Sequence, residues 1–495
     1  MKKPVFLGVD AGTTKIKAAL VDAAGETLSL VSRDAQVFKP QEGWCEMDMA
    51  DLWVQLCRIT AQLKEEAPEA FEAVAGIGIT AQGDGLWAID QAGEPVGRAM
   101  LWNDTRAKDL ALPHKAEIDQ YLVEHHGTPV VVGSMPTSLA WTKANRPEDY
   151  RRIATVFHCK DWLNFKLTGI RATDYTDGSN EAMDVFTKEY LPQVFDLMGL
   201  PEVSAMRTPA YPSTHVLGGV SGEAAKATGL KEGTPVIVGA MDVTAVSLGV
   251  GVTRPGDGCS IVGTTLSNQV LIPQEQVDHR DTTGSSLCSI LPGCFIRQMA
   301  ALSGSSTIDW ARSILVPGMD FAQIEEGLRQ VPVGSNGVLY HPYIYGERTP
   351  FRNPDACGGF YGLTARHTRF DLLRGVYEGL ILSMMDCYRH LPDTDGKVFL
   401  SGGGPQSDML CQMLGGGLGK KVCRPGAREL GIYGIVSAVK VGIGYTDDYR
   451  PVMEGGYQVF RPNEENHRKM EALYPTFVEL RESMTPYWAK RARGL

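Results

Sequence analysis

Short apolar runs alternate with small polar turns at the start of the chain, which is the pattern of β-hairpins. The apolar runs cover residues 5–9, 16–21 and 27–31, and turns separate them at Gly12-Thr13-Thr14 and at residues 22–25. We therefore predict three strands in a meander. The first run ends in a carboxylate, Asp10, directly before the Gly-Thr-Thr turn.

A helix and a buried strand are predicted next. Apolar residues recur at helical spacing within residues 50–65, and residues 74–79 form an apolar run that leads into a polar segment at 80–85. Strands and helices arranged around a central apolar strand predict an α/β domain.

The same pattern begins again near residue 235. An apolar run ends at Asp242, strand-like residues 258–262 lead into a second Gly-Thr-Thr turn at Gly263, and another strand-like run follows at 269–272. The simplest interpretation is an internal duplication in which each half opens with the same hairpin. The triplet alone is as well explained by chance, so the flanking strands carry this interpretation.

A glycine-rich loop marks the last third of the chain. An apolar strand at 397–400 runs into three glycines at 402–404, and helices are predicted at 406–418 and 429–441. A strand, a glycine loop and a helix in this order let backbone N–H groups approach a ligand closely.

Size and composition narrow the class of protein. A chain of 495 residues predicts two large domains or three smaller ones. With 43% hydrophobic and 21% charged residues it has the composition of a soluble globular protein. No stretch approaches the roughly 20 apolar residues of a membrane helix, and the N-terminal apolar run is too short for a signal peptide. We expect a cytoplasmic protein with no membrane partner.

Charge and cysteine spacing argue against two further classes. The net charge of -10 comes without a cluster of Lys and Arg, so nucleic acid is not expected as a partner. The ten cysteines form no C-x-x-C pair and no zinc pattern, so free thiols are expected.

The two Gly-Thr-Thr turns suit phosphate binding. Such a hairpin tip offers consecutive backbone N–H groups and hydroxyls to phosphate oxygens. Two tips, one from each half, would close on the two sides of a polyphosphate, and Asp10 beside the first would hold Mg²⁺, usually through water. An ordinary β-turn is the alternative for either tip alone. The sequence has no Walker pattern and no protein-kinase set of H-R-D with D-F-G, and the Rossmann spacing is missing after the first strand, so a P-loop, protein-kinase or dehydrogenase site is not expected.

Several of these segments together resemble the FGGY carbohydrate kinases, in the same order and over nearly the whole chain. The segments are 8–22, 83–84, 102–106, 239–249, 263–265, 359–363, 371–378 and 402–404. The resemblance implies an α/β protein of the actin-like ATPase superfamily, with two ribonuclease-H-like domains and a cleft between them. It implies that residues 1–247 bind the sugar and residues 248–495 bind the nucleotide.

The resemblance also assigns roles to individual residues. Asp242 would be the general base that takes the proton from the sugar hydroxyl, and Asp10 would hold Mg²⁺. The residues expected at the phosphates and adenosine of ATP are Gly12, Thr13, Thr14, Lys17, Gly263, Thr264, Thr265, Gly403, Gly404 and Asp408, with a nearby loop at 303–307. The residues expected to line the sugar pocket are Gln82, Gly83, Asp84, Trp102, Asn103 and Asp104.

Local alternatives exist for three of these interpretations. Asp242 follows a strand, where a helix N-cap is common. A Trp near a strand end, such as Trp102, more often belongs to a core. Arg106 is expected to serve the fold by pairing with Asp104 or Asp84, and we leave it out of the site.

The pair Gly83-Asp84 bears on the substrate. D-xylulose kinases typically carry Met-His here and glycerol kinases Arg-Glu, whereas Gly-Asp resembles the L-xylulose kinase and erythritol kinase branches. We expect an ATP- and Mg²⁺-dependent kinase of a small sugar, with a pentulose such as xylulose first and a linear polyol second. A weakly catalytic sensor or an actin-like conformational ATPase is the alternative of another class. The resemblance leaves a homodimer open.

Overall fold

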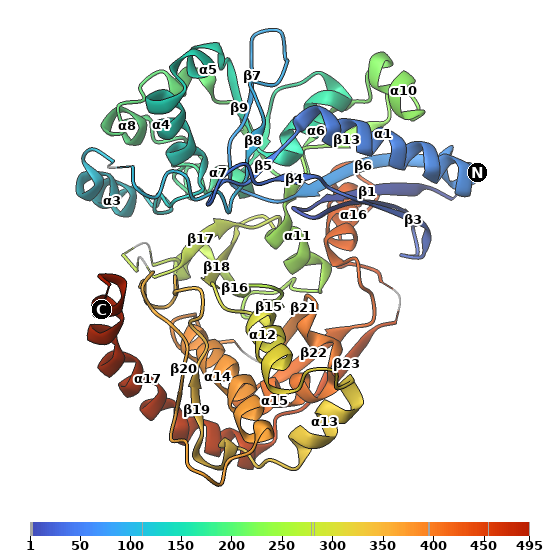
Figure 1. Ribbon diagram of the computed structural model, residues 1–495. Coiled ribbons are helices and arrows are strands. Elements are labelled where there is room, and N and C mark those ends of the chain that lie inside the picture. The colour runs from blue at the N-terminus through green and yellow to red at the C-terminus, as the bar shows by residue number, and fades with distance from the viewer. Residues whose placement is uncertain are drawn as a thin grey trace.

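The computed structural model describes residues 3–110, 112–278, 280–281, 283–394, 397–453 and 455–494. Its ribbon forms two halves, each built on a mixed β-sheet, with helix α11 (Asp242–Gly249) between them (Figure 1). The expected α/β architecture is confirmed.

The first sheet runs in the order β12-β13-β6-β1-β2-β3, and β14 also pairs with β6. Strands β1, β2 and β3 are antiparallel neighbours, while β1, β6 and β13 run parallel. The predicted meander and buried strand are therefore confirmed. The strands are β1 (Val5–Ala11), β2 (Lys15–Asp22), β3 (Thr27–Asp34), β6 (Val74–Ala81), β12 (Val216–Gly219), β13 (Pro235–Ile237) and β14 (Ala240–Met241).

The second sheet runs in the order β17-β18-β16-β15-β21-β22-β23. Its strands are β15 (Gly258–Val262), β16 (Leu266–Pro273), β17 (Ser285–Cys288), β18 (Cys294–Ala301), β21 (Lys397–Ser401), β22 (Lys421–Pro425) and β23 (Tyr457–Phe460). From β18 to β23 the strand directions repeat those from β3 to β12: two antiparallel pairs, two parallel pairs and an antiparallel pair. The topology confirms the predicted duplication.

Helices cover both faces of the first sheet. Along β1 the side chains alternate, so that Leu7 and Val9 pack against α1 (Met49–Glu66) and α6 (Cys159–Thr168), together with α10 (Gly222–Thr228). Phe6 faces the other way and packs against α16 (Leu430–Gly442). Helix α1 lies where its apolar spacing predicted it.

Helix α16 comes late in the chain but lies on the first sheet (Figure 1). It lies close to the strands because Gly8, Gly76 and Gly78 leave room for it. A Cβ on any of the three would come within 2.9 Å of an Ile or Val side chain of α16. The domain boundary at 247/248 stays a prediction. Helix α16 follows this boundary in the sequence but packs on the sheet of the first half.

Helices α11 and α16 cross at very short range between the two sheets. A Cβ on Gly249 would lie 1.8 Å from the Leu430 carbonyl oxygen, and a Cβ on Gly434 would lie 1.9 Å from the Ala245 carbonyl oxygen. Only residues with little or no side chain permit this backbone contact.

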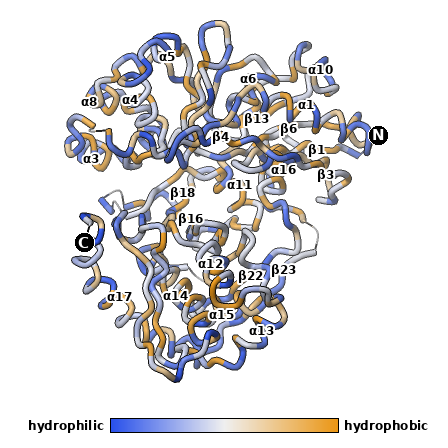
Figure 2. The backbone as a smooth tube through the Cα atoms, in the orientation of Figure 1, coloured by the Kyte–Doolittle hydropathy of each residue, from blue (hydrophilic) through white to orange (hydrophobic). Residues whose placement is uncertain are grey.

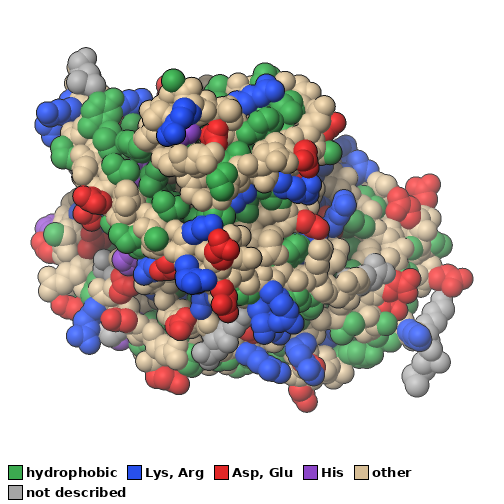
Figure 3. All heavy atoms as spheres, turned by 90° about the horizontal axis from the view of Figure 1, so that it is seen from below, with side chains coloured by type: hydrophobic (Ala, Val, Ile, Leu, Met, Phe, Trp, Pro, Cys, Tyr) green, Lys and Arg blue, Asp and Glu red, His purple; other side chains and the backbone are tan. Residues whose placement is uncertain are grey.

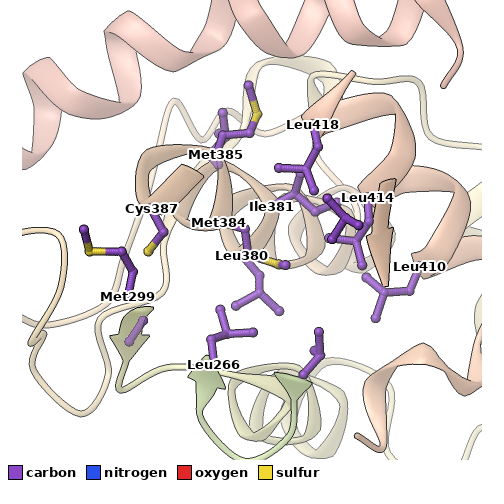
Figure 4. Packing of buried hydrophobic residues seen from close by; sticks show 14 of the residues in the cluster. Leu266, Met299, Leu380, Ile381, Met384, Met385, Cys387, Leu410, Leu414 and Leu418 are labelled. Carbon is purple, nitrogen blue, oxygen red and sulfur yellow. The ribbon is translucent and has the colours of Figure 1, made fainter. Parts of the chain in front are cut away.

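The core of the second half surrounds helix α14 (Arg369–Arg389), which is buried along most of its length. Leu380 points toward Leu266 of β16, and Ile381 points toward Leu414 of α15 (Asp408–Leu418) (Figure 4). In both halves the apolar segments follow inner strands and helices, and polar segments follow the outer loops (Figure 2). Helix α15 begins two residues later than predicted because the Ser407 side chain caps it.

Smaller elements complete each half. In the first half they are β4 (Val37–Phe38), β5 (Glu46–Met47), α2 (Pro68–Phe71), β7 (Trp87–Ile89), β8 (Ala99–Met100), α3 (Lys115–Glu124), α4 (Met135–Asn145), α5 (Pro147–Arg152), β9 (Thr155–Phe157), β10 (Thr173–Asp174), α7 (Tyr175–Gly178), α8 (Pro192–Leu197), α9 (Val203–Met206) and β11 (Ala210–Tyr211). In the second half they are η1 (Gln274–Gln276), α12 (Ser305–Leu315), α13 (Phe321–Arg329), η2 (Ser335–Gly337), β19 (Leu339–His341), β20 (Gly359–Tyr361), η3 (Gly404–Gln406) and α17 (Glu464–Ala492).

The surface charges, the helices and the cysteines bear on the expected class of protein. On the face seen from below, acidic and basic side chains are interspersed (Figure 3). None of the helices in the described residues is both long and apolar enough to cross a membrane. The ten cysteines all lie in the described ranges and are free, as expected.

The helix crossing makes a testable prediction about stability. Gly434→Ala should lower the free energy of unfolding by about 1–3 kcal/mol, because the added methyl forces α16 away from α11. Gly416→Ala in α15 is the matched control, since its Cβ would lie 3.4 Å from Asn466 and alanine favours a helix. Urea unfolding of both variants measures the difference, and equal stabilities would contradict the close crossing.

Candidate active site

Parallel strand ends bring the predicted acidic residues to one edge of the first sheet. Asp10 lies opposite Thr80 in β6, and Thr80 lies opposite Ala240 in β14. The chain therefore leaves these strands side by side, with Asp10 at the end of β1 and Asp242 directly after β14. In open α/β sheets, ligands bind beyond this edge.

Asp242 is the first residue of α11, and its Oδ1 accepts a hydrogen bond from the Val243 N–H at 2.7 Å. The cap position belongs to Met241, so Asp242 is not the N-cap residue. Burial raises the pKa of Asp242 to about 7, and the nearby carboxylates of Asp10, Asp177 and Asp84 add to the rise. A carboxylate with a pKa near neutrality is suited to accept a proton.

Asp10 makes no hydrogen bond or ion pair with the described residues. Its neighbour Lys17 is instead paired with Glu429 at 2.6 Å. Burial raises the pKa of Asp10 to about 6, against the opposing effect of Lys17. A partly buried carboxylate whose oxygens are unused fits a hard divalent cation such as Mg²⁺.

A hydrogen-bonded chain links the first Gly-Thr-Thr turn to the predicted sugar residues. The Trp102 indole N–H donates to the Thr13 hydroxyl at 3.0 Å, and that hydroxyl donates to the Gln82 side-chain oxygen at 2.9 Å. Trp102 is only partly buried, which does not favour the core alternative. Thr13 is thus engaged on the sugar side, whereas Thr14 and the partly buried Gly12 remain at the tip.

The Gly83-Asp84 pair lies against Met241, the residue before Asp242. A Cβ on Gly83 would lie 2.2 Å from the Met241 sulfur, so a larger residue would force the Met241 side chain, next to Asp242, to move. Asp84 has a left-handed backbone with φ of 57°, and its Oδ1 is buried without a hydrogen-bond partner. Burial raises the pKa of Asp84 to about 7.

Asp104 is directed into the protein. Its carboxylate pairs with Arg106 at 2.6 Å and accepts from the Cys45 N–H at 2.7 Å. Arg106 also pairs with Glu46 at 2.8 Å and lies over the Trp44 ring. The structural role expected for Arg106 is confirmed. Asp104 holds the loop that carries Trp102, and its oxygens are used inside the protein, whereas Asn103 is exposed.

The second Gly-Thr-Thr turn is supported by the loop at 303–307. The Ser305 N–H donates to the Gly263 carbonyl at 2.7 Å, and the Gly304 N–H donates to the Thr264 carbonyl at 3.1 Å. With these carbonyls bound from the loop side, the turn presents the exposed Thr264 and the partly buried Gly263 and Thr265.

The glycine loop lies against the base of this turn. A Cβ on Gly402 would meet the Val262 carbonyl oxygen at 2.4 Å, and one on Gly404 would meet the Val262 side chain at 2.6 Å. A Cβ on Gly403 would meet nothing within 4 Å. Asp408, at the start of α15, pairs with Arg424 at 2.5 Å and is largely exposed. The structure thus brings the glycine loop and the second turn together.

A buried ionic cluster behind Gly83 was not anticipated from the sequence. Lys160 is fully buried and pairs with Asp161, Asp174 and Asp177 at 2.5, 3.0 and 2.9 Å. Although His158, Asp161 and Asp177 are close enough to share a metal, Lys160 already neutralises two of them. The available signal was Lys160 in the first turn of α6 and His158 directly before this helix, both next to apolar residues.

Matches to family models now identify the chain. Residues 5–249 match the N-terminal domain, and residues 259–440 the C-terminal domain, of the FGGY family of carbohydrate kinases. The chain belongs to this family. It is therefore a carbohydrate kinase, an enzyme that transfers a phosphoryl group from ATP to a sugar or polyol. The two duplicated halves form the actin-like ATPase fold of FGGY kinases.

Individual relatives extend over the whole chain. A probable L-xylulose kinase from Pasteurella multocida (strain Pm70) is 30% identical over 449 residues, covering 90% of this chain and 92% of that protein. An erythritol kinase from Brucella abortus (strain 2308) is 29% identical and covers 100% of this chain and 99% of its own length. A ligand-bound xylulose kinase structure from Lactobacillus acidophilus has a TM-score of 0.91 at 21% identity, with 98% and 99% of the two chains covered, which shows the shared fold.

The crowded carboxylates of this FGGY kinase predict a cost in stability. Asp242→Asn should raise the free energy of unfolding of the ligand-free protein at pH 8, because the amide carries no charge to desolvate. The folded-state pKa of about 7 lies above the ordinary 3.8, so the gain should be full above pH 7 and shrink as the pH falls toward 4.

Thermal unfolding at pH 8 and pH 5.5, without Mg²⁺, measures this difference. Each 1 kcal/mol should appear as a shift of about 2–4 °C in Tm. Asp447→Asn is the control because Asp447 is exposed. A Tm for Asp242→Asn that equals the wild-type Tm at pH 8 would contradict the prediction.

Proposed function

We propose that this FGGY kinase phosphorylates a terminal hydroxyl of a small ketose, with a pentulose such as xylulose as the first candidate. The observation that carries the proposal is the position of Asp242, a carboxylate with a pKa near neutrality, at the same sheet edge as Asp10 and Asp84. Relatives named L-xylulose kinase and xylulose kinase support the sugar class.

In this proposal Asp242 takes the proton from the attacking hydroxyl. In-line positioning and charge neutralisation supply most of the catalysis in phosphoryl transfer, so a single base suffices. Asp84 and Gln82 would bind sugar hydroxyls, with Gly83, Trp102 and Asn103 lining the pocket. Asp104 would position Trp102 without touching the sugar, because its oxygens are already bonded.

The two turns would hold ATP from opposite sides. Gly12, Thr14 and Lys17 would approach the phosphates from the first half, with Thr13 connecting them to the sugar pocket. The turn from Gly263 through Thr264 to Thr265 would do so from the second half. The residues proposed beside the adenosine are Gly403, Gly404 and Asp408. Asp10 would hold Mg²⁺, which neutralises the charge of the phosphate oxygens during transfer.

A linear polyol is the second candidate substrate. It is favoured by the erythritol kinase from Brucella abortus, which this chain matches from end to end. Cytoplasmic location and a homodimer stay predictions.

A substrate panel tests the proposal. Purified protein with Mg²⁺-ATP should release ADP strongly with one ketopentose among D- and L-ketopentoses, ketohexoses, tetritols, pentitols and glycerol. Asp242→Asn should lower the turnover about 10²–10⁴-fold with sugar affinity largely kept, because only the proton transfer is lost. If the wild-type protein binds a sugar without turnover, a sensor is favoured. If it responds to a tetritol alone, the linear polyol is favoured as the substrate.

The pH profile gives an independent check of the base. Because Asp242 must be ionised, kcat/KM for the sugar should fall about tenfold per pH unit below pH 7. The apparent pKa belongs to Asp242 together with the carboxylates that raise it, Asp10 first and then Asp177 and Asp84, so the acid limb should lie at lower pH in Asp84→Asn than in wild type. A flat profile between pH 5.5 and 8 would argue against a buried carboxylate base.

A further inference from the structure

Arg348 lies on the second half, beside the second Gly-Thr-Thr turn, and no role has been assigned to it so far. Its Nε donates to the Ala300 carbonyl at 2.9 Å. Ala300 lies in β18 opposite Ser267, two residues past the turn. The neighbouring Glu347 fixes the segment, because its Oε1 accepts from the Leu302 and Arg348 N–H groups at 2.9 and 2.7 Å.

The outer end of the guanidinium is unused. In the described part of the chain, neither terminal nitrogen of Arg348 has a hydrogen-bond acceptor, and no carboxylate pairs with it. Burial lowers the pKa of Arg348 from its ordinary value. Arg348 is partly buried, and a guanidinium has five N–H donors, so its terminal nitrogens are available to a ligand oxygen.

Asp84 of the first half is the complementary group. Its Oδ1 is buried without a hydrogen-bond partner. Burial raises the pKa of Asp84 to about 7, and the positive charges of His158 and, more weakly, Arg348 oppose that rise. The two halves already meet nearby, since the Cys288 N–H of β17 donates to the Ser179 hydroxyl at 3.2 Å. An unused acceptor and an unused donor group thus lie within electrostatic reach across the cleft.

We propose that Arg348 is a substrate-binding residue that donates hydrogen bonds to the carbonyl oxygen of the ketose while Asp84 accepts one from a neighbouring hydroxyl. The inference rests on the proposed sugar kinase function. A carbonyl oxygen carries no hydrogen, so only a donor can bind it, and Asp10, Asp84 and Asp242 are acceptors when ionised. Arg348 therefore favours a ketose over the corresponding alditol.

Gln82 does not supply this donor equally well. Its side-chain oxygen accepts from Thr13, and its amide nitrogen points toward the Met47 sulfur at 4.0 Å. Gly83 has no side chain to contribute. A donor from the opposite half would bind the carbonyl oxygen without disturbing these contacts of Gln82.

The test compares Arg348→Met with Arg352→Met, which removes an exposed arginine of the same loop. Arg348→Met should raise the KM and the equilibrium dissociation constant of the ketose about 10- to 100-fold, the loss expected for a charged hydrogen bond, and leave the KM of ATP within about twofold. It should also reduce the preference for ketose over alditol. Arg352→Met should match wild type.

Two further variants separate binding from a merely structural role. Arg348→Lys keeps a cation without the planar fork and should recover part of the sugar affinity. The effects of Arg348→Met and Asp84→Asn on sugar affinity should be non-additive, because both groups hold one ligand. Thermal unfolding of each variant shows whether the loop stays folded.

The outcomes are distinguishable. An active wild-type enzyme whose sugar affinity is unchanged in Arg348→Met, with only kcat or the KM of ATP altered, overturns the assignment and places Arg348 at the phosphates. A wild-type protein that phosphorylates no sugar overturns the proposed function instead. The equilibrium sugar titration still reports on Arg348 in that case, because it needs no turnover.

Discussion

The close crossing of α11 and α16 is the contact on which the rest of the structure depends. Both helices begin at the site: α11 starts with Asp242, and a Cβ on Gly431 near the start of α16 would lie 3.1 Å from Asp10. The backbone contact between Gly249 and Gly434 therefore does more than join the halves. It sets how far Asp242 lies from Asp10, so larger residues at the crossing would change the geometry of the proposed base and metal ligand together.

The site concentrates negative charge that the protein does not fully compensate. Lys160 pairs with Asp177 deep in the first half, but the carboxylates of Asp10, Asp84 and Asp242 have no ion pair among the described residues. Their raised pKa values measure the cost of holding them together. Cations delivered by the ligands and by the second half would relieve that cost, so substrate binding would be favoured by the same carboxylates that destabilise the ligand-free protein.

The local sequence pattern predicted the helices and strands, whereas contacts between segments far apart in the chain could not be predicted from it. The alternation around Asp10 predicted the first hairpin, and the repeated turn at Gly263 predicted the duplication, because both signals are local. The glycines Gly8 and Gly78 read as ordinary strand residues, since the helix they accommodate lies far along the chain. Asp84 and Arg348 are also far apart in the sequence, so their relation could not be predicted. The sequence suggested that Arg106 pairs with Asp104, but it did not show that this pair directs the Asp104 carboxylate into the protein.

The duplicated hairpins have the same strand directions, but their turns differ by one residue and their chemistry differs: Ala11 pairs with Ile16 across the first turn, and Val262 pairs with Leu266 across the second. Counting back two residues from each turn, the first half has Asp10 and the second has Ile261. Across the hairpin, Asp10 faces Lys17 whereas Ile261 faces Ser267. The first half would therefore supply the acceptors that a sugar hydroxyl needs in order to lose its proton, and the turn of the second half would add backbone N–H groups and hydroxyls that stabilise the phosphate oxygens. Transfer of a phosphoryl group requires both at once, so neither half would catalyse it alone.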